Sequence, residues 1–194
     1  DVLSVYAGLR PLIKADASST AALSRDHLIS ISDSGLITLA GGKWTTYRKM
    51  AEDVIDHAEM IGALEHRYCS THELPVHGAA VGVTETTHLH YYGSDAEGIR
   101  GLITADSALG EVLHPRLEFL KAEVIWHVRH EMARTVEDVL ARRTRALLLD
   151  ARASMEAAPV VAALMATELG QDEAWINAQV EAYQAQAKGY LLPE

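Results

Sequence analysis

A glycine-centred segment sets the pattern for this chain: Gly35-Leu36-Ile37-Thr38-Leu39-Ala40-Gly41-Gly42-Lys43-Trp44-Thr45-Thr46-Tyr47-Arg48. Residues 35–40 are mainly apolar and alternate in the way that is typical of a strand. After the two glycines, apolar residues recur at helical spacing, and Thr45 or Thr46 is a candidate N-cap. We therefore expect a strand, a glycine turn and then a helix that runs from Trp44 to about Ile61 and stops at Gly62.

This expected turn has two interpretations. A helix start gathers unpaired N–H groups and the positive end of the helix dipole, and Lys43 adds a full positive charge. A site of this kind can bind an anion or the electron-rich edge of a ring. The alternative is a tight turn whose glycines serve only the backbone conformation, with Lys43 in solvent. Short glycine motifs alone do not decide between the two.

The residues before the turn predict a β-hairpin. Leu28 to Ile31 alternate, and Asp33-Ser34-Gly35 is a good turn, so residues 36–40 return antiparallel to them. This pairing brings Arg25 to the same end of the hairpin as Lys43. Further upstream, apolar residues alternate from Val2 to Leu12, which predicts another strand, with Arg10 at its carboxyl end.

The residues after residue 64 change in character. Residues 65–82 contain Pro75 and Gly78 without periodicity and are read as a connector. The remainder is predicted to be helical, in segments 85–92, 96–105, 117–133, 136–143, 151–169 and 172–188. Thr135 and Asp138 form a carboxylate variant of a capping box, and Gly170 ends a helix. The fold class is thus α+β: an antiparallel hairpin and helix in domain 1–68, then a predominantly α-helical domain 69–194.

Composition excludes several classes of protein. The chain has 194 residues, 48% of them hydrophobic and 23% charged, as in globular proteins. A formal net charge of −10 argues against nucleic acid as a partner and against electrostatic anchoring on anionic lipid. The longest apolar runs are too short to span a membrane. The single Cys69 excludes an intramolecular disulfide and is compatible with a reducing cytoplasm.

Two blocks of sequence, taken in order, resemble the FAD-dependent glycerol-3-phosphate dehydrogenases. The first block includes Val5-Tyr6-Ala7-Gly8-Leu9-Arg10-Pro11-Leu12, Ser24-Arg25-Asp26-His27 and the glycine segment quoted above. The second runs from Leu120 to Arg145 and resembles the C-terminal helical domain of that family. Together they cover essentially the whole chain. These enzymes are aerobic and quinone-linked, and the oxygen-using glycerophosphate oxidases are their close relatives.

The resemblance implies roles for particular residues. Arg10, Arg25 and Lys43 would bind the phosphate of sn-glycerol 3-phosphate, because guanidinium and ammonium groups form charge-assisted hydrogen bonds with phosphate oxygens. The turn would approach the pyrimidine end of the FAD ring and stabilise the charge of the reduced flavin. The residues of that cofactor contact are Gly41, Gly42, Lys43, Trp44, Thr45 and Thr46. The catalytic base stays unassigned; His27, close to Arg25, is one candidate.

The resemblance also implies that more chain is needed. The sequence contains no strand–GxGxxG–helix motif for the FAD pyrophosphate, and it opens at Asp1. We expect the C-terminal part of a flavoenzyme that oxidises glycerol 3-phosphate to dihydroxyacetone phosphate, inactive without its N-terminal FAD domain. Quinone is the expected acceptor, and a homodimer is left open. The location would be the cytoplasm or the inner face of the cytoplasmic membrane. The alternatives are an oxidase that uses oxygen and a non-catalytic, stand-alone anion-binding module.

Histidines and arginines elsewhere give weaker signals. His88 and His90 are two residues apart and would face different sides of a helix, while His127 and His130 lack an obvious third ligand, so no metal site is predicted. The charged residues from Arg129 to Arg143 alternate in sign. An ion-pair network within the helical domain is the favoured interpretation of this cluster, and a substrate or interface site is the alternative.

Overall fold

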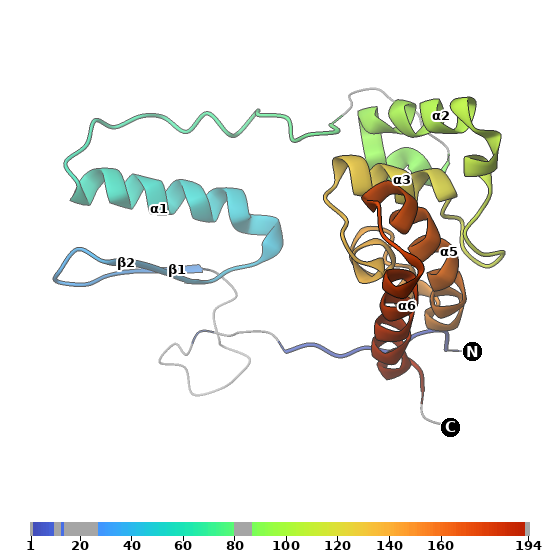
Figure 1. Ribbon diagram of the computed structural model, residues 1–194. Helices are drawn as coiled ribbons and strands as arrows, with labels where there is room; N and C mark the ends of the chain where they lie inside the picture. The colour runs from blue at the N-terminus through green and yellow to red at the C-terminus, as the bar shows by residue number, and fades with distance from the viewer. Residues whose placement is uncertain (1, 10–12, 14–26, 80–86, 193–194) are drawn as a thin grey trace. The chain divides into compact units, whose positions relative to one another are not determined.

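The computed structural model describes residues 2–9, 13, 27–79 and 87–192 (Figure 1). The chain divides into two compact units. We call Gly8–Val76 the hairpin unit, and Asp1–Ala7 together with His77–Glu194 the helical unit. An antiparallel hairpin followed by mostly helical structure confirms the α+β prediction.

The predicted hairpin is present in the hairpin unit. Strand β1 (His27–Ile31) pairs antiparallel with β2 (Ile37–Gly41), from His27 opposite Gly41 to Ile31 opposite Ile37. Gly35 has a positive φ of 83°, which a glycine adopts without strain, and its N–H donates to the Ser32 carbonyl at 2.9 Å. The turn therefore lies where the sequence places it.

The helix after the glycine turn is also present, although it begins with a tighter turn. The 3₁₀ helix η2 (Trp44–Thr46) leads into α1 (Tyr47–Ile61), which lies along the hairpin in Figure 1. Gly62 caps α1 in the right-handed region, and Ala63 takes the left-handed conformation instead, with φ of 48°. Residues 62–79 form neither helix nor strand, as the connector prediction requires.

The helical unit is built from short and long helices. Its first part contains η3 (His88–Asp95), α2 (Ala96–Ala105), η4 (Ser107–Gly110) and α3 (Lys121–His130). Its second part contains the π-helix η5 (Asp138–Arg143), α4 (Ala146–Leu149), α5 (Ala151–Leu169), α6 (Glu173–Ala187) and η6 (Lys188–Tyr190). The bounds of α2 and α5 agree with the sequence prediction.

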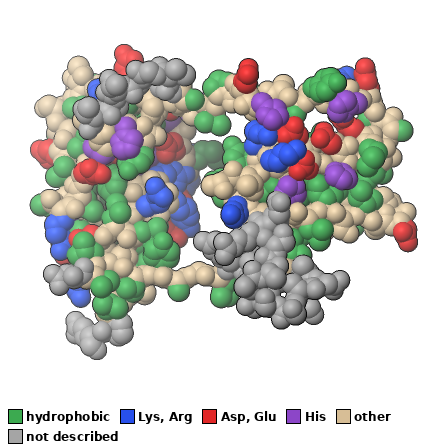
Figure 2. All heavy atoms as spheres, turned by 180° about the vertical axis from the view of Figure 1, so that it is seen from behind, with side chains coloured by type: hydrophobic (Ala, Val, Ile, Leu, Met, Phe, Trp, Pro, Cys, Tyr) green, Lys and Arg blue, Asp and Glu red, His purple; other side chains and the backbone are tan. Residues whose placement is uncertain are grey.

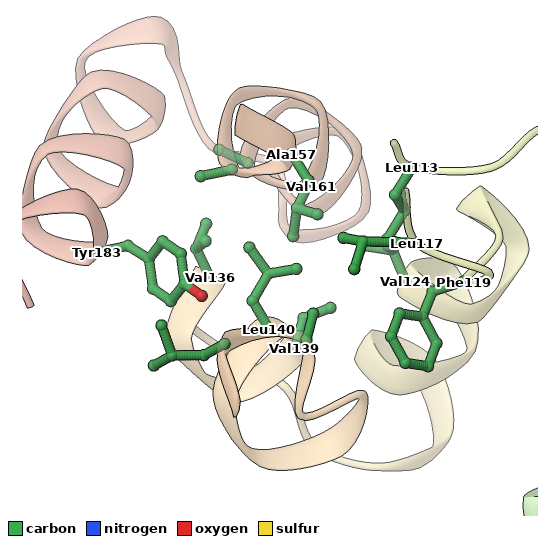
Figure 3. Close-up of a cluster of buried hydrophobic side chains, with 14 of the residues drawn as sticks. Leu113, Leu117, Phe119, Val124, Val136, Val139, Leu140, Ala157, Val161 and Tyr183 are labelled. Atoms are coloured by element: carbon green, nitrogen blue, oxygen red, sulfur yellow. The ribbon is translucent and has the colours of Figure 1, made fainter. Parts of the chain in front are cut away.

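The larger hydrophobic cluster of this unit contains residues of both parts, and a smaller cluster lies in the first part. Figure 3 shows Leu140, Val136 and Val139 pointing toward Tyr183 of α6 and Val161 of α5. Leu140 has no solvent-exposed surface, as expected for a residue at the centre of a packed core. The described residues of the hairpin unit, by contrast, include none that is fully buried. Apolar burial in the described part of the chain is therefore concentrated in the helical unit.

The strand predicted from Val2 to Leu12 is wrong for the residues that the structure describes. Residues 2–9 are assigned to no strand, and residues 10–12 lie outside the described part. The segment instead bonds to the helical unit: the Val5 N–H donates to the Tyr190 carbonyl at 2.8 Å, and the Ala151 N–H donates to the Leu3 carbonyl at 3.1 Å. The alternation of apolar residues does not predict that this segment hydrogen-bonds to the ends of helices rather than to another strand.

Several predicted helices have different bounds. The helix expected over 85–92 is, where the structure describes it, the 3₁₀ helix η3, which runs on to Asp95. The helix expected from residue 117 begins at Lys121, because residues 112 and 120 form an antiparallel bridge first. The helix expected from residue 136 contains a π-helix, in which the Thr144 N–H donates to the carbonyl of Val139, five residues back, at 3.0 Å. The capping box before it is confirmed: Asp138 N–H donates to Thr135 Oγ1 at 3.2 Å, and Thr135 N–H donates to Asp138 Oδ2 at 2.9 Å.

Helix α5 has a recognisable cap at each end. Its N-cap, Asp150, accepts a hydrogen bond from Ala153 N–H at 2.9 Å, and Gly170 ends the helix in the left-handed conformation, as predicted. Asp150 also lies 3.4 Å from the Arg116 guanidinium. The cap and the ion pair therefore share one carboxylate.

We expect Asp150→Ala to lower the free energy of unfolding of the helical unit by about 1–2 kcal/mol, since it removes an N-cap oxygen. Urea denaturation followed by circular dichroism measures this loss. Asp150→Asn is the matched control, because its amide oxygen keeps the cap and only the Arg116 ion pair is weakened. Equal losses in the two variants would contradict the cap assignment.

Across the described residues, none of the helices combines the length and the apolar character needed to cross a lipid bilayer.

Candidate functional site

The glycine turn leaves the end of the hairpin in a backbone conformation that favours glycine. Gly41 and Gly42 have φ of 76° and 79°, and Gly41 is the last residue of the ladder, opposite His27. A Cβ on Gly42 would lie 2.4 Å from Met50 Sδ, so a side chain there would also displace Met50. Two consecutive positive φ values and this close contact explain the two glycines.

A local hydrogen-bond pair fixes the start of the helix. The Lys43 N–H donates to Thr46 Oγ1 at 3.1 Å, and Thr46 Oγ1 donates to the Lys43 carbonyl at 2.9 Å. Thr46 occupies the N-cap position of α1, as predicted, but its hydroxyl bonds back to Lys43 rather than forward into the helix. The Tyr47 N–H donates to the Trp44 carbonyl, and the start of α1 remains the positive end of the helix dipole.

The side chains of this turn are open to solvent. The Lys43 side chain is exposed, and its ammonium group has no hydrogen bond or ion pair with any residue that the structure describes. Trp44 is 87% exposed and stacks on Tyr47 with ring centroids 5.6 Å apart. Thr45 is exposed as well. The turn therefore presents one cation and one aromatic face to whatever lies next to it.

The neighbouring cations on α1 are paired with carboxylates. Arg48 Nη2 lies 3.0 Å from Glu52 Oε2, and Lys49 Nζ lies 2.6 Å from Asp53 Oδ1. The hydrogen bond from Lys49, together with one from His27, lowers the pKa of Asp53. Figure 2 shows basic, acidic and histidine side chains next to one another on the hairpin unit. Lys43 is therefore distinguished from Arg48 and Lys49 by its lack of a described partner.

His27 connects the hairpin to α1. Its Nε2 lies 2.8 Å from Asp53 Oδ2, so one ring nitrogen is engaged with a carboxylate of the helix. This contact is compatible with a structural role and with a histidine oriented for proton transfer. The role of His27 as catalytic base stays a prediction.

Arg10 and Arg25, predicted to share the substrate site with Lys43, lie outside the described residues. Their assignment to phosphate binding stays a prediction. The structure places Gly41, Gly42, Lys43, Trp44, Thr45 and Thr46 together in one turn, and their contact with a flavin likewise stays a prediction.

One group of potential metal ligands was not singled out from the sequence. Asp56, Glu59 and His66 bring one ligand atom each to within 4.8 Å of one another on the hairpin unit. His66 Nδ1 already lies 2.9 Å from Glu59 Oε2, and the Asp56 and His66 side chains are exposed. Exposed acidic groups of this kind are common without a cation, so we assign no metal to them.

A buried polar cluster in the helical unit was also not predicted. Glu123 is 1% exposed, and its carboxylate accepts hydrogen bonds from Tyr92 Oη at 2.8 Å and from Leu120 N–H at 2.5 Å. His88 Nε2 lies 2.8 Å from the same carboxylate, and His127 Nε2 lies 2.7 Å from Tyr92 Oη. We call His88, Tyr92, Glu123 and His127 the polar cluster.

The environment of the polar cluster shifts two pKa values. Burial, followed by the charge of Arg143, lowers the pKa of His127 to about 3, so this imidazole is neutral near pH 7. Burial and the neighbouring Glu123 raise the pKa of Tyr92. Tyr92 therefore keeps its proton and can donate it to the Glu123 carboxylate.

Together, the hairpin with its glycine turn and the separate, mostly helical unit define an α+β protein of two compact units. Comparison with known proteins identifies the family. The family model described as the C-terminal domain of alpha-glycerophosphate oxidase matches residues 34–176, so the chain belongs to this family.

Curated relatives carry related names. The chain is 37% identical to a probable mitochondrial glycerol-3-phosphate dehydrogenase of Caenorhabditis elegans over 93% of its own length and 28% of the relative. It is 35% identical to the mitochondrial enzyme of Mesocricetus auratus over 93% of its length and 28% of that relative. It is 31% identical to glycerol-3-phosphate dehydrogenase 2 of Mycobacterium tuberculosis over 100% of its length and 36% of that protein. The chain thus spans about a third of these relatives' length.

Proposed function

We propose that this chain is the C-terminal part of an FAD-dependent enzyme that oxidises sn-glycerol 3-phosphate to dihydroxyacetone phosphate. The proposal rests on family membership together with one observation: the Lys43 ammonium is exposed at the helix start and has no partner among the described residues. A phosphate group carries close to two negative charges and is attracted to such a cation. Lys43 would bind the substrate phosphate together with Arg10 and Arg25.

The turn fits the pyrimidine edge of a flavin chemically. Consecutive glycines with positive φ allow close approach of the backbone, and the N–H groups at the start of α1 favour negative charge. When bound, FAD supplies the hydride acceptor for the substrate carbon. The residues of the turn would orient the ring and stabilise charge on it, while the FAD pyrophosphate would be held by another part of the enzyme.

The experiment is to replace Lys43 with alanine in the full-length enzyme of which this chain forms part. We expect the KM for glycerol 3-phosphate, measured with an artificial electron acceptor, to rise roughly 10- to 100-fold, because one charge-assisted hydrogen bond is lost. Lys49→Ala is the matched control: it removes an equal charge nearby, but from a residue that is paired with Asp53. An unchanged KM in Lys43→Ala would exclude Lys43 from the substrate site.

The electron acceptor is a second part of the proposal. We infer a quinone, and with it a peripheral place on the inner face of the cytoplasmic membrane, because the relatives are named dehydrogenases. The name of the matching family model, which refers to an oxidase, favours molecular oxygen as the alternative. Rates with a short-chain quinone under nitrogen and with oxygen alone distinguish the two. Absence of any glycerol 3-phosphate oxidation would favour a non-catalytic anion-binding module.

A further inference from the structure

A pocket of about 550 Å³ lies within the helical unit, and none of the residues that the proposed function uses lines it. Tyr92, Glu123 and His127 of the polar cluster line it. Tyr6 of the N-terminal segment and Arg145, which precedes α4, line it as well. The pocket is thus bounded by four separate parts of the helical unit.

The polar cluster leaves one acceptor of this wall unsatisfied. Tyr92 donates its only hydroxyl proton to Glu123, so His127 must donate its Nε2–H to Tyr92 Oη. The lone pair then lies on His127 Nδ1, which is buried and has no hydrogen-bond partner among the described residues. His127 is 1% exposed, and a buried polar group of this kind calls for a water or ligand donor.

Arg145 provides a cation that the rest of the unit does not neutralise. Other arginines of the same stretch are engaged: Arg129 with Glu168 at 2.6 Å, and Arg142 with Glu137 at 2.7 Å. Arg143 donates to the carbonyl of Glu131 at 3.0 Å. Arg145 is exposed and has no ion pair or hydrogen bond with its side chain in the part of the chain that the structure describes.

The backbone around Arg145 is unusual in two ways. Arg145 has φ of 57° and ψ of 23°, the left-handed region that is uncommon for a residue other than glycine. It follows the π-helix η5 directly after Thr144. Strained residues and π-helical turns both concentrate at functional sites. Here both occur at the edge of the same pocket.

The remaining lining residues favour a ligand with an apolar body. Tyr91 and Tyr6 are each 70% exposed and Leu149 is 57% exposed, so aromatic and aliphatic surface surrounds the opening. Glu118, Glu123 and Glu131 also line the pocket, and their charges would repel a dianion more strongly than an anion with one negative charge. A ligand with a single negative charge matches the single available guanidinium.

We propose that this pocket binds a small carboxylic acid with an aromatic or aliphatic body, with its carboxylate paired to Arg145 and its body against Tyr6, Tyr91 and Leu149. The planar guanidinium offers a carboxylate two parallel hydrogen bonds. The proposal is independent of glycerol 3-phosphate oxidation and is tested on the 194-residue chain itself.

The probe is benzoate, titrated into the labelled chain and followed by NMR, with phenyl phosphate and benzyl alcohol as comparisons. We expect saturable binding of benzoate with a dissociation constant on the order of millimolar, as a ligand of its size permits. Resonances of the Tyr92 and His127 rings should shift along the same titration curve. Phenyl phosphate and benzyl alcohol should bind more weakly.

Arg145→Gln should weaken benzoate binding about 10- to 100-fold, which corresponds to the loss of a charge-assisted hydrogen bond. Arg152→Gln, which changes an exposed arginine of α5 outside the pocket lining, should leave it unchanged. The proposal is overturned if benzoate does not saturate wild type, if the Tyr92 and His127 rings do not respond, or if Arg145→Gln binds as tightly. Tighter binding of phenyl phosphate would overturn the carboxylate assignment.

Discussion

Acidification below pH of about 6.5 is expected to destabilise the helical unit, and His127 is expected to account for much of the loss. Burial lowers the pKa of this imidazole to about 3 in the folded state. Below a pH of about 6.5, the ordinary pKa of histidine, His127 binds a proton in the unfolded chain but stays neutral in the folded chain. The free energy of unfolding therefore falls as the pH falls. Each pH unit in the window between about 6.5 and 3 costs roughly 1.4 kcal/mol, and the whole window about 5 kcal/mol.

The test compares urea denaturation of wild type and His127→Gln over this pH range. Glutamine is neutral at every pH, so the difference in unfolding free energy between the two proteins should shrink or reverse toward acid pH. Tyr92, Glu123, Glu131 and Arg143 surround His127 and are retained in the variant. The exposed His90 serves as control, since His90→Gln should follow wild type. Parallel pH curves for wild type and His127→Gln would contradict a neutral His127.

The elements that could be predicted from the sequence are those determined by neighbouring residues in the chain. Turn residues and alternation define the hairpin, and its observed register runs from His27–Gly41 to Ile31–Ile37. Helix α5 begins behind Asp150 and ends at Gly170, because an N-cap carboxylate and a left-handed glycine act within one turn of the helix. The two positive φ values at Gly41 and Gly42 belong to the same group of local effects.

The predictions that were wrong concern segments whose structure depends on contacts with residues far away in the sequence. Residues 2–9 are extended, as their alternation suggests, but they bond to Tyr190 and Ala151, which are far away in sequence. The bridge between Val112 and Leu120 likewise delays the start of α3. Periodicity describes the local conformation and the buried face of a segment, and it does not identify its partner.

The polar cluster has a partial signal in the sequence. His88 and Tyr92 are four residues apart, as are Glu123 and His127, a spacing that would place each pair on one face of an α-helix. Nothing in the spacing, however, joins the two pairs, since Tyr92 and Glu123 are separated by 31 positions in the sequence. Lys43 was recognised because its motif is continuous, whereas this cluster is assembled by packing of α3 against the segment that contains η3.

The second large effect is expected from Leu140→Ala. Leu140 is fully buried and lies in the core shown in Figure 3, between Val136, Val139 and the side chains of α5 and α6. Truncation removes apolar contacts and leaves a cavity, which should lower the free energy of unfolding by about 2–5 kcal/mol. Leu149→Ala is the control, because this leucine is 57% exposed and should change stability by less than about 0.5 kcal/mol.

Hydrogen exchange locates this loss within the chain. Because the hairpin unit and the helical unit are separate compact units, amides of α3, α5 and α6 should lose protection in Leu140→Ala while amides of α1 keep theirs. The described hairpin unit has no fully buried residue, so its amides should exchange by local opening in wild type already. Equal loss of protection in α1 would mean that both units unfold together, and the helical core would then also support the turn that carries Lys43.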